Sequence, residues 1–215
     1  MTEEARRDEQ VSAFSLRTIG PEPPGATPLE PEDLEGLIPD FVATRADLNV
    51  VEFENITKAL PWALRQARLL GTEGILAYGF MMDLHSHMFG DVWTWAGTPR
   101  RRETSIGVAR QVVPFQSMHA LDDAKYWHAE EVFAPDDLAA RIHCRLVSIH
   151  PFVNGNGRCT RLMADLYLTA IGSRPFSWGG TNLDVDGSGR QEYIAALVKA
   201  AHSDDYADLV QFARA

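Results

Sequence analysis

Cysteine and long apolar runs are both scarce in this sequence. Cys144 and Cys159 are the only two cysteines among 215 residues. They are too few for a disulfide framework or a metal-cysteine cluster, so we expect a reducing, cytoplasmic setting. No apolar run approaches the roughly 20 residues that a membrane-spanning helix needs. Residues 1–5 also lack the basic and then apolar pattern of a signal peptide. These absences predict a soluble protein with no membrane partner.

Basic residues are in the minority as well. The chain has 20 Lys and Arg against 30 Asp and Glu, which gives a formal net charge of −10. This balance argues against a broad surface for nucleic acid or anionic lipid, and no direct nucleic-acid binding is expected. A small basic pocket remains compatible with it.

Composition divides the chain into an arm and a domain. Residues 1–30 are polar at first and then proline-rich, which favours extended chain over helix. We interpret them as an extended or flexible N-terminal arm. Residues 31–215 have enough apolar material for one buried domain.

Apolar residues at helical spacing fill most of this domain. The pattern predicts a short helix near residues 32–36 and a long one from a Thr44 N-cap to about residue 70, kinked or divided at Pro61. Further helices are predicted over residues 73–88, 117–129, 135–149, 158–171, 190–201 and 204–213. Residues 103–114 break the pattern, because two short runs flank Ala109 and Arg110 and predict a β-hairpin. The expected fold class is all-α with one β-hairpin.

The segment 150–161 carries the strongest chemical signal. It reads His-Pro-Phe-Val-Asn-Gly-Asn-Gly-Arg-Cys-Thr-Arg. Pro151 disfavours a helical conformation at the residue before it, so a helix should end near His150. Gly155 and Gly157 permit positive φ angles, which lets successive N–H groups form an anion-binding nest.

Two arginines follow in the first turn of the next predicted helix, a position that disfavours cations. Arg158 and Arg161 lie three residues apart, on one face of this turn. A polyphosphate between the loop amides and both guanidiniums explains this placement, with His150 beside it as a proton acceptor. The alternative is an ordinary helix–turn–helix with a glycine cap and two solvated arginines. The flanking His, Pro and Phe favour the nucleotide site.

These residues resemble the signature of the Fic family, His-x-Phe-x-Asp/Glu-Gly-Asn-Gly-Arg-x-x-Arg. Every fixed position matches except one, where Asn154 replaces the acidic residue. The Trp-Ala-Gly segment 95–97, the predicted hairpin and the helix around Tyr193 extend the likeness. The layout, with residues 106–108 and 175–180, also resembles the subgroup called mobile mystery protein B, whose members are often encoded beside a helix-turn-helix protein. The resemblance implies a Fic-type helical domain in which the hairpin is a flap.

The resemblance further implies a protein adenylyltransferase, which moves AMP from ATP to a Ser, Thr or Tyr hydroxyl of a target protein. His150 would deprotonate that hydroxyl and Arg190 and Tyr193 would line the adenosine pocket. The family's Asn-Arg pair is Gly189-Arg190 here, and plain packing for Tyr193 is the alternative. The phosphates would be held by Gly155, Asn156, Gly157, Arg158 and Arg161. A target segment would pair with the flap at Ser105, Ile106, Gly107 and Val108, and a purely structural hairpin is the alternative.

Asn154 departs from the family at the residue that binds Mg²⁺. Mg²⁺ prefers carboxylate oxygen, and a neutral amide is a poorer ligand. Three outcomes are open: weaker metal binding through Asn154, a metal held by phosphates and water alone, or loss of AMP transfer. We expect a weakened Mg²⁺ site.

Many Fic proteins also carry an inhibitory helix with Ser/Thr-x-x-x-Glu-Gly/Asn. Its glutamate pairs with the second signature arginine and displaces the γ-phosphate. Residues 50–55 match this motif at Glu54 and Asn55 but have Val50 in place of the hydroxyl residue. Residues 45–60 are therefore a candidate inhibitory helix. The alternative is a solvated glutamate, since Glu52 is equally polar.

Two other functions remain open. One is a Fic-fold phosphotransferase, although that branch resembles Ala-Asn-Lys-Arg where this chain has Gly-Asn-Gly-Arg. The other is a catalytically weak binding or regulatory partner of a mobile-element helix-turn-helix protein. Asn154 favours this reading and the intact His150, Arg158 and Arg161 argue against it. The six other histidines, His85 and His87 among them, show no metal-ligand spacing and are interpreted as surface or core residues.

Overall fold

The computed structural model describes residues 29–180, 183 and 187–215. The predicted arm, residues 1–30, falls almost entirely outside them. In chain order the helices are α2 (Pro31–Leu34), α3 (Arg45–Ile75), α4 (Tyr78–Phe89), α5 (Val113–Ala129), α6 (Pro135–Ile149), α7 (Asn156–Ala170), α8 (Ser188–Ser203) and α9 (Ala207–Arg214), with 3₁₀ turns η1 (Arg110–Val112) and η2 (Trp178–Gly180). No helix in this described part is both long and apolar enough to cross a bilayer.

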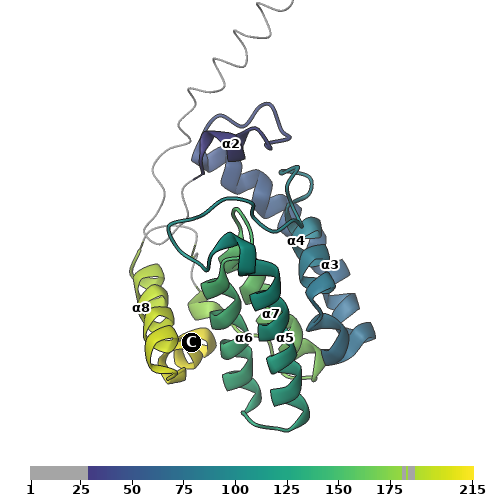
Figure 1. Ribbon diagram of the computed structural model, residues 1–215, viewed down its shortest axis with the longest axis vertical. Helices are drawn as coiled ribbons and strands as arrows, with labels where there is room; N and C mark the ends of the chain where they lie inside the picture. The colour runs from purple at the N-terminus through teal and green to yellow at the C-terminus, as the bar shows by residue number, and fades with distance from the viewer. Residues whose placement is uncertain (1–28, 181–182, 184–186) are drawn as a thin grey trace, which may run out of the picture.

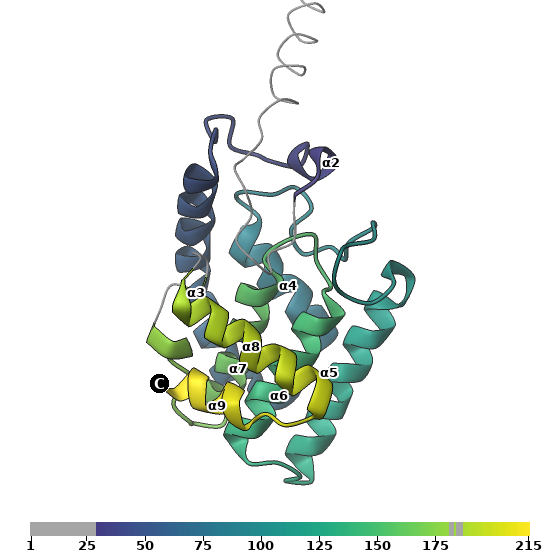
Figure 2. The same ribbon diagram turned by 90° about the vertical axis from the view of Figure 1, so that its left-hand side faces the viewer.

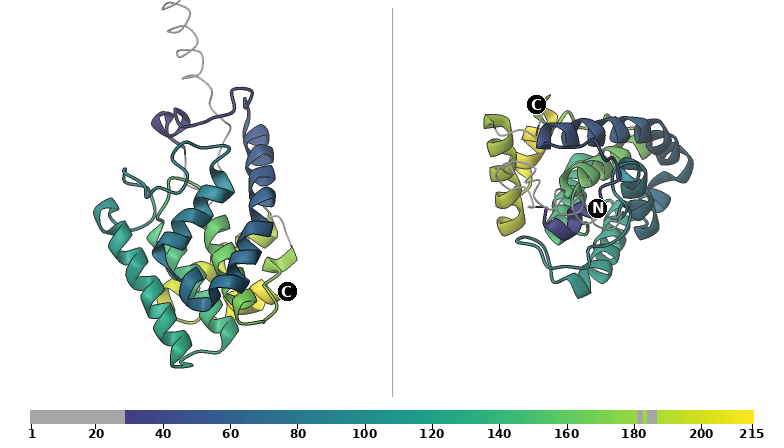
Figure 3. Two further views of the ribbon diagram at one scale, coloured as in Figure 1. Left: turned by 90° about the vertical axis from the view of Figure 1, so that its right-hand side faces the viewer. Right: turned by 90° about the horizontal axis from the view of Figure 1, so that it is seen from above.

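The helices are arranged around a central pair, α6 and α7. α5 packs against α6, α3 and α4 pack against α7, and α8 and α9 pack against each other and against α6. Figure 2 shows α8 and α9 crossing in front of this pair, and Figure 3 shows α3, α5 and α8 on three different sides of it. The loop between α6 and α7, which is the signature loop, is mostly buried.

The buried face of α3 carries polar side chains and alanines, whereas two of its larger apolar residues are exposed. The helix starts where expected, because Thr44 and Asp47 form a reciprocal capping box. It runs through Pro61 without dividing, and its break is at Gly71, where φ is +60°. Val50 and Phe53 are 56% and 69% exposed, whereas the face toward α4 and α7 is built from Leu48, Glu52, Asn55, Ala59, Ala63 and Ala67.

The two helices of the central pair begin and end as the sequence predicted, within two residues. α6 opens on Pro135 with two aspartates in its first turn, and its C-cap is His150 in the left-handed conformation. α7 begins after Gly155, whose φ is +75°.

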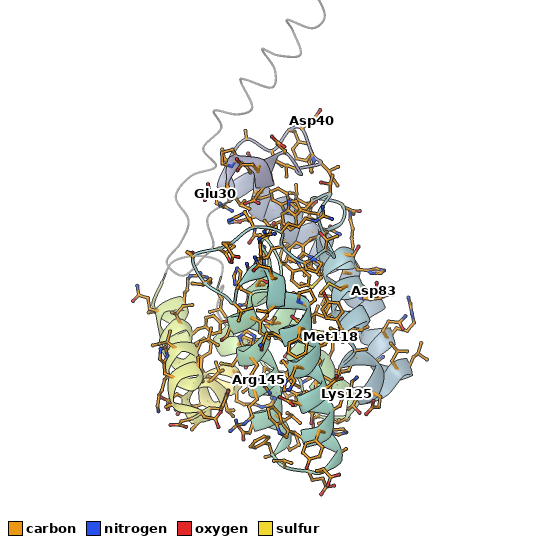
Figure 4. The ribbon with its side chains drawn as sticks, in the orientation of Figure 1. Glu30, Asp40, Asp83, Met118, Lys125 and Arg145 are labelled. Carbon is orange, nitrogen blue, oxygen red and sulfur yellow. The ribbon has the colours of Figure 1, made fainter. Side chains whose placement is uncertain are left out.

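α5 and α6 are also joined by an ion pair between Asp123 and Arg145, whose Nη1 lies 2.7 Å from Asp123 Oδ2. Figure 4 labels Arg145 together with Met118 and Lys125 on α5.

The predicted β-hairpin over residues 103–114 is wrong. No strand forms in the described part of the chain, the segment is a loop followed by η1, and α5 already begins at Val113, with a proline in its first turn. The backbone groups of the segment bind elsewhere: Val108 N–H donates to the Ile149 carbonyl at 3.2 Å, and Arg110 N–H donates to the Glu103 carboxylate at 3.2 Å. The all-α class is confirmed, and residues 103–109 are called the 103–109 loop below.

Candidate active site

A pocket of about 370 Å³ opens where α3, α6, α7 and α8 meet the signature loop. Its lining brings together most of the residues singled out from the sequence: His150, Asn154, Gly155, Asn156, Gly157, Arg158, Arg161, Arg190 and Tyr193, with Ile106 from the 103–109 loop. α3 contributes Arg45, Asn49 and Glu52. Ser105, Gly107 and Val108 are outside the lining, as are Glu54 and Asn55.

His150 is held as a neutral imidazole at the end of α6. Its φ is +58°, and only 5% of the residue is exposed. Burial lowers its pKa from the ordinary 6.5 to about 4, the charges of Arg100 and Arg102 lower it further, and a hydrogen bond to the Val147 backbone opposes them. A neutral imidazole can accept a proton at pH 7, as the chemistry expected of this residue requires.

Side chains of the signature loop and of the first turn of α7 stabilise the backbone of this loop. Asn156 makes two hydrogen bonds to the Phe152 backbone: its Oδ1 accepts from the N–H at 2.8 Å and its Nδ2 donates to the carbonyl at 2.9 Å. Gly155 has no substitute, because a Cβ there would lie 2.5 Å from the Phe89 ring. Gly157 does not use the positive φ that the sequence allowed, since it lies in the first turn of α7. Amides in a first helical turn lack intrahelical acceptors, so this turn offers donors to an anion.

His85 supports the same loop from α4, a role that the sequence did not reveal. Its ring stacks on Phe152 with centroids 3.7 Å apart, and the side chain is fully buried. Its Nδ1 accepts the Gly97 N–H at 3.0 Å, so the proton is on Nε2, which donates to the Asn154 carbonyl at 3.1 Å. Burial lowers its pKa to about 3. The one signal in the sequence that could have indicated this role is the Trp-Ala-Gly segment, because its Gly97 supplies the N–H that His85 accepts.

The glutamate and the arginine that pair here both differ from the predicted Glu54 and second signature arginine, because Glu52 pairs with Arg158. Arg158 Nη1 lies 2.8 Å from Glu52 Oε2, and the Glu52 side chain is 1% exposed. Trp93 Nε1 donates to the other oxygen, Oε1, at 2.7 Å. Glu54 is exposed on α3, because a step of two residues turns a helix by about 200°. Asn55 is buried and joins α3 to the end of α4 through the His87 carbonyl and the Asp91 amide.

Arg161 faces Tyr193 of α8, with its guanidinium carbon 5.6 Å from the ring centroid. The Tyr193 hydroxyl lies 2.9 Å from Nε2 of the buried His143, whose Nδ1 lies 3.0 Å from the Thr160 hydroxyl. That hydroxyl donates to the Asn156 carbonyl at 2.8 Å, so His143 Nδ1 carries a proton and the tyrosine donates to Nε2. This chain of bonds joins the pocket wall to the signature loop. Separately, Arg190 donates to the Leu183 carbonyl.

Comparisons with known proteins point to one family. Residues 76–168 match the model of the Fic/DOC family. The chain contains a Fic/DOC family domain. It is 31% identical over 138 residues to protein adenylyltransferase fic-1 of Caenorhabditis elegans, a match that spans 62% of this chain and 25% of that protein. The chain thus spans about a quarter of the length of the curated relatives it matches.

Solved structures show the same fold. A Fic-domain-containing signaling protein from Bacteroides thetaiotaomicron superposes with a TM-score of 0.63 at 17% identity, covering 99% of this chain and 86% of that one. BepC protein from Bartonella tribocorum, solved with bound AMPPNP, superposes with a TM-score of 0.59 at 12% identity, covering 80% and 87%.

The Fic domain has few oxygen ligands for Mg²⁺ at the signature loop. Asn154 Oδ1 accepts the Gly155 N–H at 2.7 Å, and the described residues contain no group of three His, Cys, Asp or Glu side chains placed to hold a metal. Glu52, the one carboxylate that the described residues contribute to the pocket lining, is paired with Arg158. These residues do not fit a Mg²⁺ site held by the protein alone.

Three buried neutral histidines predict that the Fic domain loses stability on acidification. The pKa values of His85, His143 and His150 all lie below 6.5 because the rings are buried. Between about pH 6.5 and pH 4 the unfolded chain therefore binds protons that the folded domain does not, so stability falls as the pH falls. Burial raises the pKa of Asp165 to about 6, and this group offsets one of the three histidines below pH 6.

The unfolded chain therefore binds about two more protons than the folded domain. This difference corresponds to a loss of roughly 2 to 3 kcal/mol in the free energy of unfolding per pH unit between pH 6 and pH 5. Urea unfolding followed by tryptophan fluorescence at constant ionic strength measures this slope. A free energy of unfolding that is constant from pH 6.5 to pH 5 would contradict the expectation.

Proposed function

We propose that this Fic domain transfers AMP from ATP to a hydroxyl group of a target protein. The supporting observation is that one pocket holds a neutral buried His150, the amide end of α7, and the guanidiniums of Arg158 and Arg161. Its relatives from Caenorhabditis elegans and Nematostella vectensis are named protein adenylyltransferases.

The chemistry follows from where each group lies. His150 takes the proton of the target Ser, Thr or Tyr hydroxyl, and the oxygen then bonds to the α-phosphorus of ATP. The bond between that phosphorus and the β-phosphate oxygen breaks, and pyrophosphate leaves with the electron pair. Arg158, Arg161 and the first-turn amides of α7 neutralise the charge that develops on the phosphates. Alignment of the target hydroxyl with the α-phosphorus supplies most of the remaining rate enhancement.

Glu52 is our candidate for the inhibitory residue, in place of Glu54. It already pairs with the arginine that we assign to the phosphates, so a bound nucleotide must displace its carboxylate from Arg158. Trp93 holds the other carboxylate oxygen and keeps the side chain directed into the pocket. The N-terminal part of α3 thus acts as the inhibitory helix.

Mg²⁺ is proposed to enter with the nucleotide and to gain little from Asn154, whose amide oxygen already accepts a hydrogen bond. Asn154→Asp is therefore expected to raise Mg²⁺-dependent turnover and to lower the Mg²⁺ concentration at half-maximal rate by about tenfold, because a carboxylate is the better ligand. Titration of Mg²⁺ at saturating ATP measures both quantities. An unchanged or lower rate at every metal concentration would overturn the assignment of this position.

Labelled ATP tests the proposed function directly. Label from the α-phosphate that stays on protein supports AMP transfer, and label from the γ-phosphate alone supports the phosphotransferase alternative. Label from neither position, with ATP still bound, supports the binding role that Asn154 favours. The helix-turn-helix partner, the mobile mystery protein B subgroup and the cytoplasmic location remain predictions from the sequence.

A further inference from the structure

Arg100 is a buried arginine that the proposed chemistry does not use. It follows the Trp-Ala-Gly segment, and its side chain is 0% exposed. A charged side chain is costly to bury unless its hydrogen bonds are satisfied. The nearest carboxylate that pairs with it is Glu103, at 3.6 Å from Nη1, and that side chain is 58% exposed. The guanidinium is therefore held mainly by backbone carbonyl groups.

Those carbonyls belong to two segments that meet at the pocket. Nε donates to the His150 carbonyl at 2.7 Å, Nη1 donates to the Arg102 carbonyl at 2.9 Å, and Nη2 donates to the Val108 carbonyl. Arg102 and Val108 stand near the two ends of the 103–109 loop. One planar group thus binds both ends of this loop and the backbone of the histidine.

Backbone contacts on both sides reinforce this arrangement. Arg100 N–H donates to the Pro151 carbonyl at 2.9 Å, and Val108 N–H donates to the Ile149 carbonyl at 3.2 Å. Gly107 has a φ of +106°, and a Cβ on it would lie 2.6 Å from the Cβ of His150. The 103–109 loop therefore lies directly against the histidine, with no room for a side chain between them.

We propose that Arg100 is a positioning residue that locks the 103–109 loop and His150 into one arrangement, so that a target segment on this loop presents its hydroxyl to the imidazole. The coupling to catalysis rests on the proposed function, whereas the lock itself does not. A lysine cannot replace the arginine, because an ammonium lacks the fixed planar donors that reach three carbonyls at once. The charge of Arg100 also helps to lower the pKa of His150.

Amide hydrogen exchange tests the lock without any need for activity. In Arg100→Met, exchange of the Val108 and Arg100 amides is expected to become at least about tenfold faster, while the amides in the middle of α7 keep their wild-type rates. Arg100→Lys is expected to fall between Met and wild type. Arg101→Met is the matched control, because it removes the neighbouring, exposed guanidinium and should change none of these rates.

A second variant keeps the test decisive if Arg100→Met fails to fold. Gly107→Ala places a methyl group against His150 from an exposed loop position, and it should speed exchange at Val108 while α7 remains protected. Unchanged exchange at Val108 in both Arg100→Lys and Gly107→Ala would overturn the lock.

Kinetics test the coupling to catalysis. Arg100→Lys is expected to raise KM for the target protein and to lower kcat, together by about tenfold or more in kcat/KM. KM for ATP should be unchanged, because the hydrogen bonds and the ion pair of Arg100 go to residues 102, 103, 108, 150 and 151 and not to Arg158, Arg161 or the first turn of α7. A rise in KM for ATP alone would overturn the coupling. If the wild-type domain transfers no AMP, the proposed function fails, and the exchange data still decide the lock.

Discussion

His150→Ala is expected to reduce the transfer of α-phosphate label to protein by about 10² to 10⁴-fold, the range for loss of a positioned general base. The imidazole lines the pocket and its pKa is about 4, so it is unprotonated at neutral pH and its ring nitrogen can serve as a proton acceptor. Alanine removes the acceptor but leaves Arg158 and Arg161 in place. ATP affinity should therefore stay within about threefold of wild type.

Single-turnover measurements with saturating ATP separate the chemical step from binding. His119→Ala is a suitable control, because His119 is exposed on α5 outside the pocket lining, and it should retain the wild-type rate. A His150→Ala domain that transfers label at the wild-type rate would remove the histidine from the mechanism. Loss of ATP binding in the same variant would show that the residue holds the pocket instead.

The signature loop could be predicted from sequence because its residues act on their neighbours. Pro151 ends a helix, Gly155 takes a positive φ, and Asn156 binds the backbone of Phe152 four residues earlier. The helix end at Pro151 and the positive φ of Gly155 were predicted from the sequence, whereas the bonds of Asn156 to Phe152 were seen only in the structure. The positions of His150, Arg158 and Arg161 in one pocket follow from these local constraints.

Contacts between segments distant in the chain could not be predicted in this way. Glu52 and Glu54 have the same chemistry and lie on one helix, and only the packing of α3 against α7 decides which of them meets Arg158. Arg100 lies 50 residues before the carbonyl that it binds. The hairpin was mispredicted because Val108 N–H of the 103–109 loop donates to the distant Ile149 carbonyl, and Arg110 N–H donates to the Glu103 side chain, where a hairpin would place a partner strand.

Glu52→Gln is expected to increase the affinity for ATP by about 10- to 100-fold. The carboxylate of Glu52 lies 2.8 Å from Arg158 Nη1, and a hydrogen bond to a charged group is worth roughly 1.5 to 3 kcal/mol, where about 1.4 kcal/mol corresponds to tenfold in binding. Glutamine keeps an oxygen for the Trp93 N–H, so the packing of α3 is retained while the competing charge is lost. Phosphate oxygens then meet Arg158 without competition from the Glu52 carboxylate.

Glu54→Gln makes the same chemical change two residues away, on the exposed side of α3, and is expected to leave ATP binding and self-modification at wild-type levels. Calorimetric titration with ATP, together with α-label retained on the domain itself, compares the two variants. Equal effects of both would mean that general acidity near the pocket, and not the pair with Arg158, limits nucleotide binding. An effect of Glu54→Gln alone would restore the inhibitory role that the sequence motif assigns to Glu54. A large effect confined to Glu52→Gln would instead show that the inhibitory residue of this chain is the glutamate buried against Trp93 and not the one that matches the sequence motif.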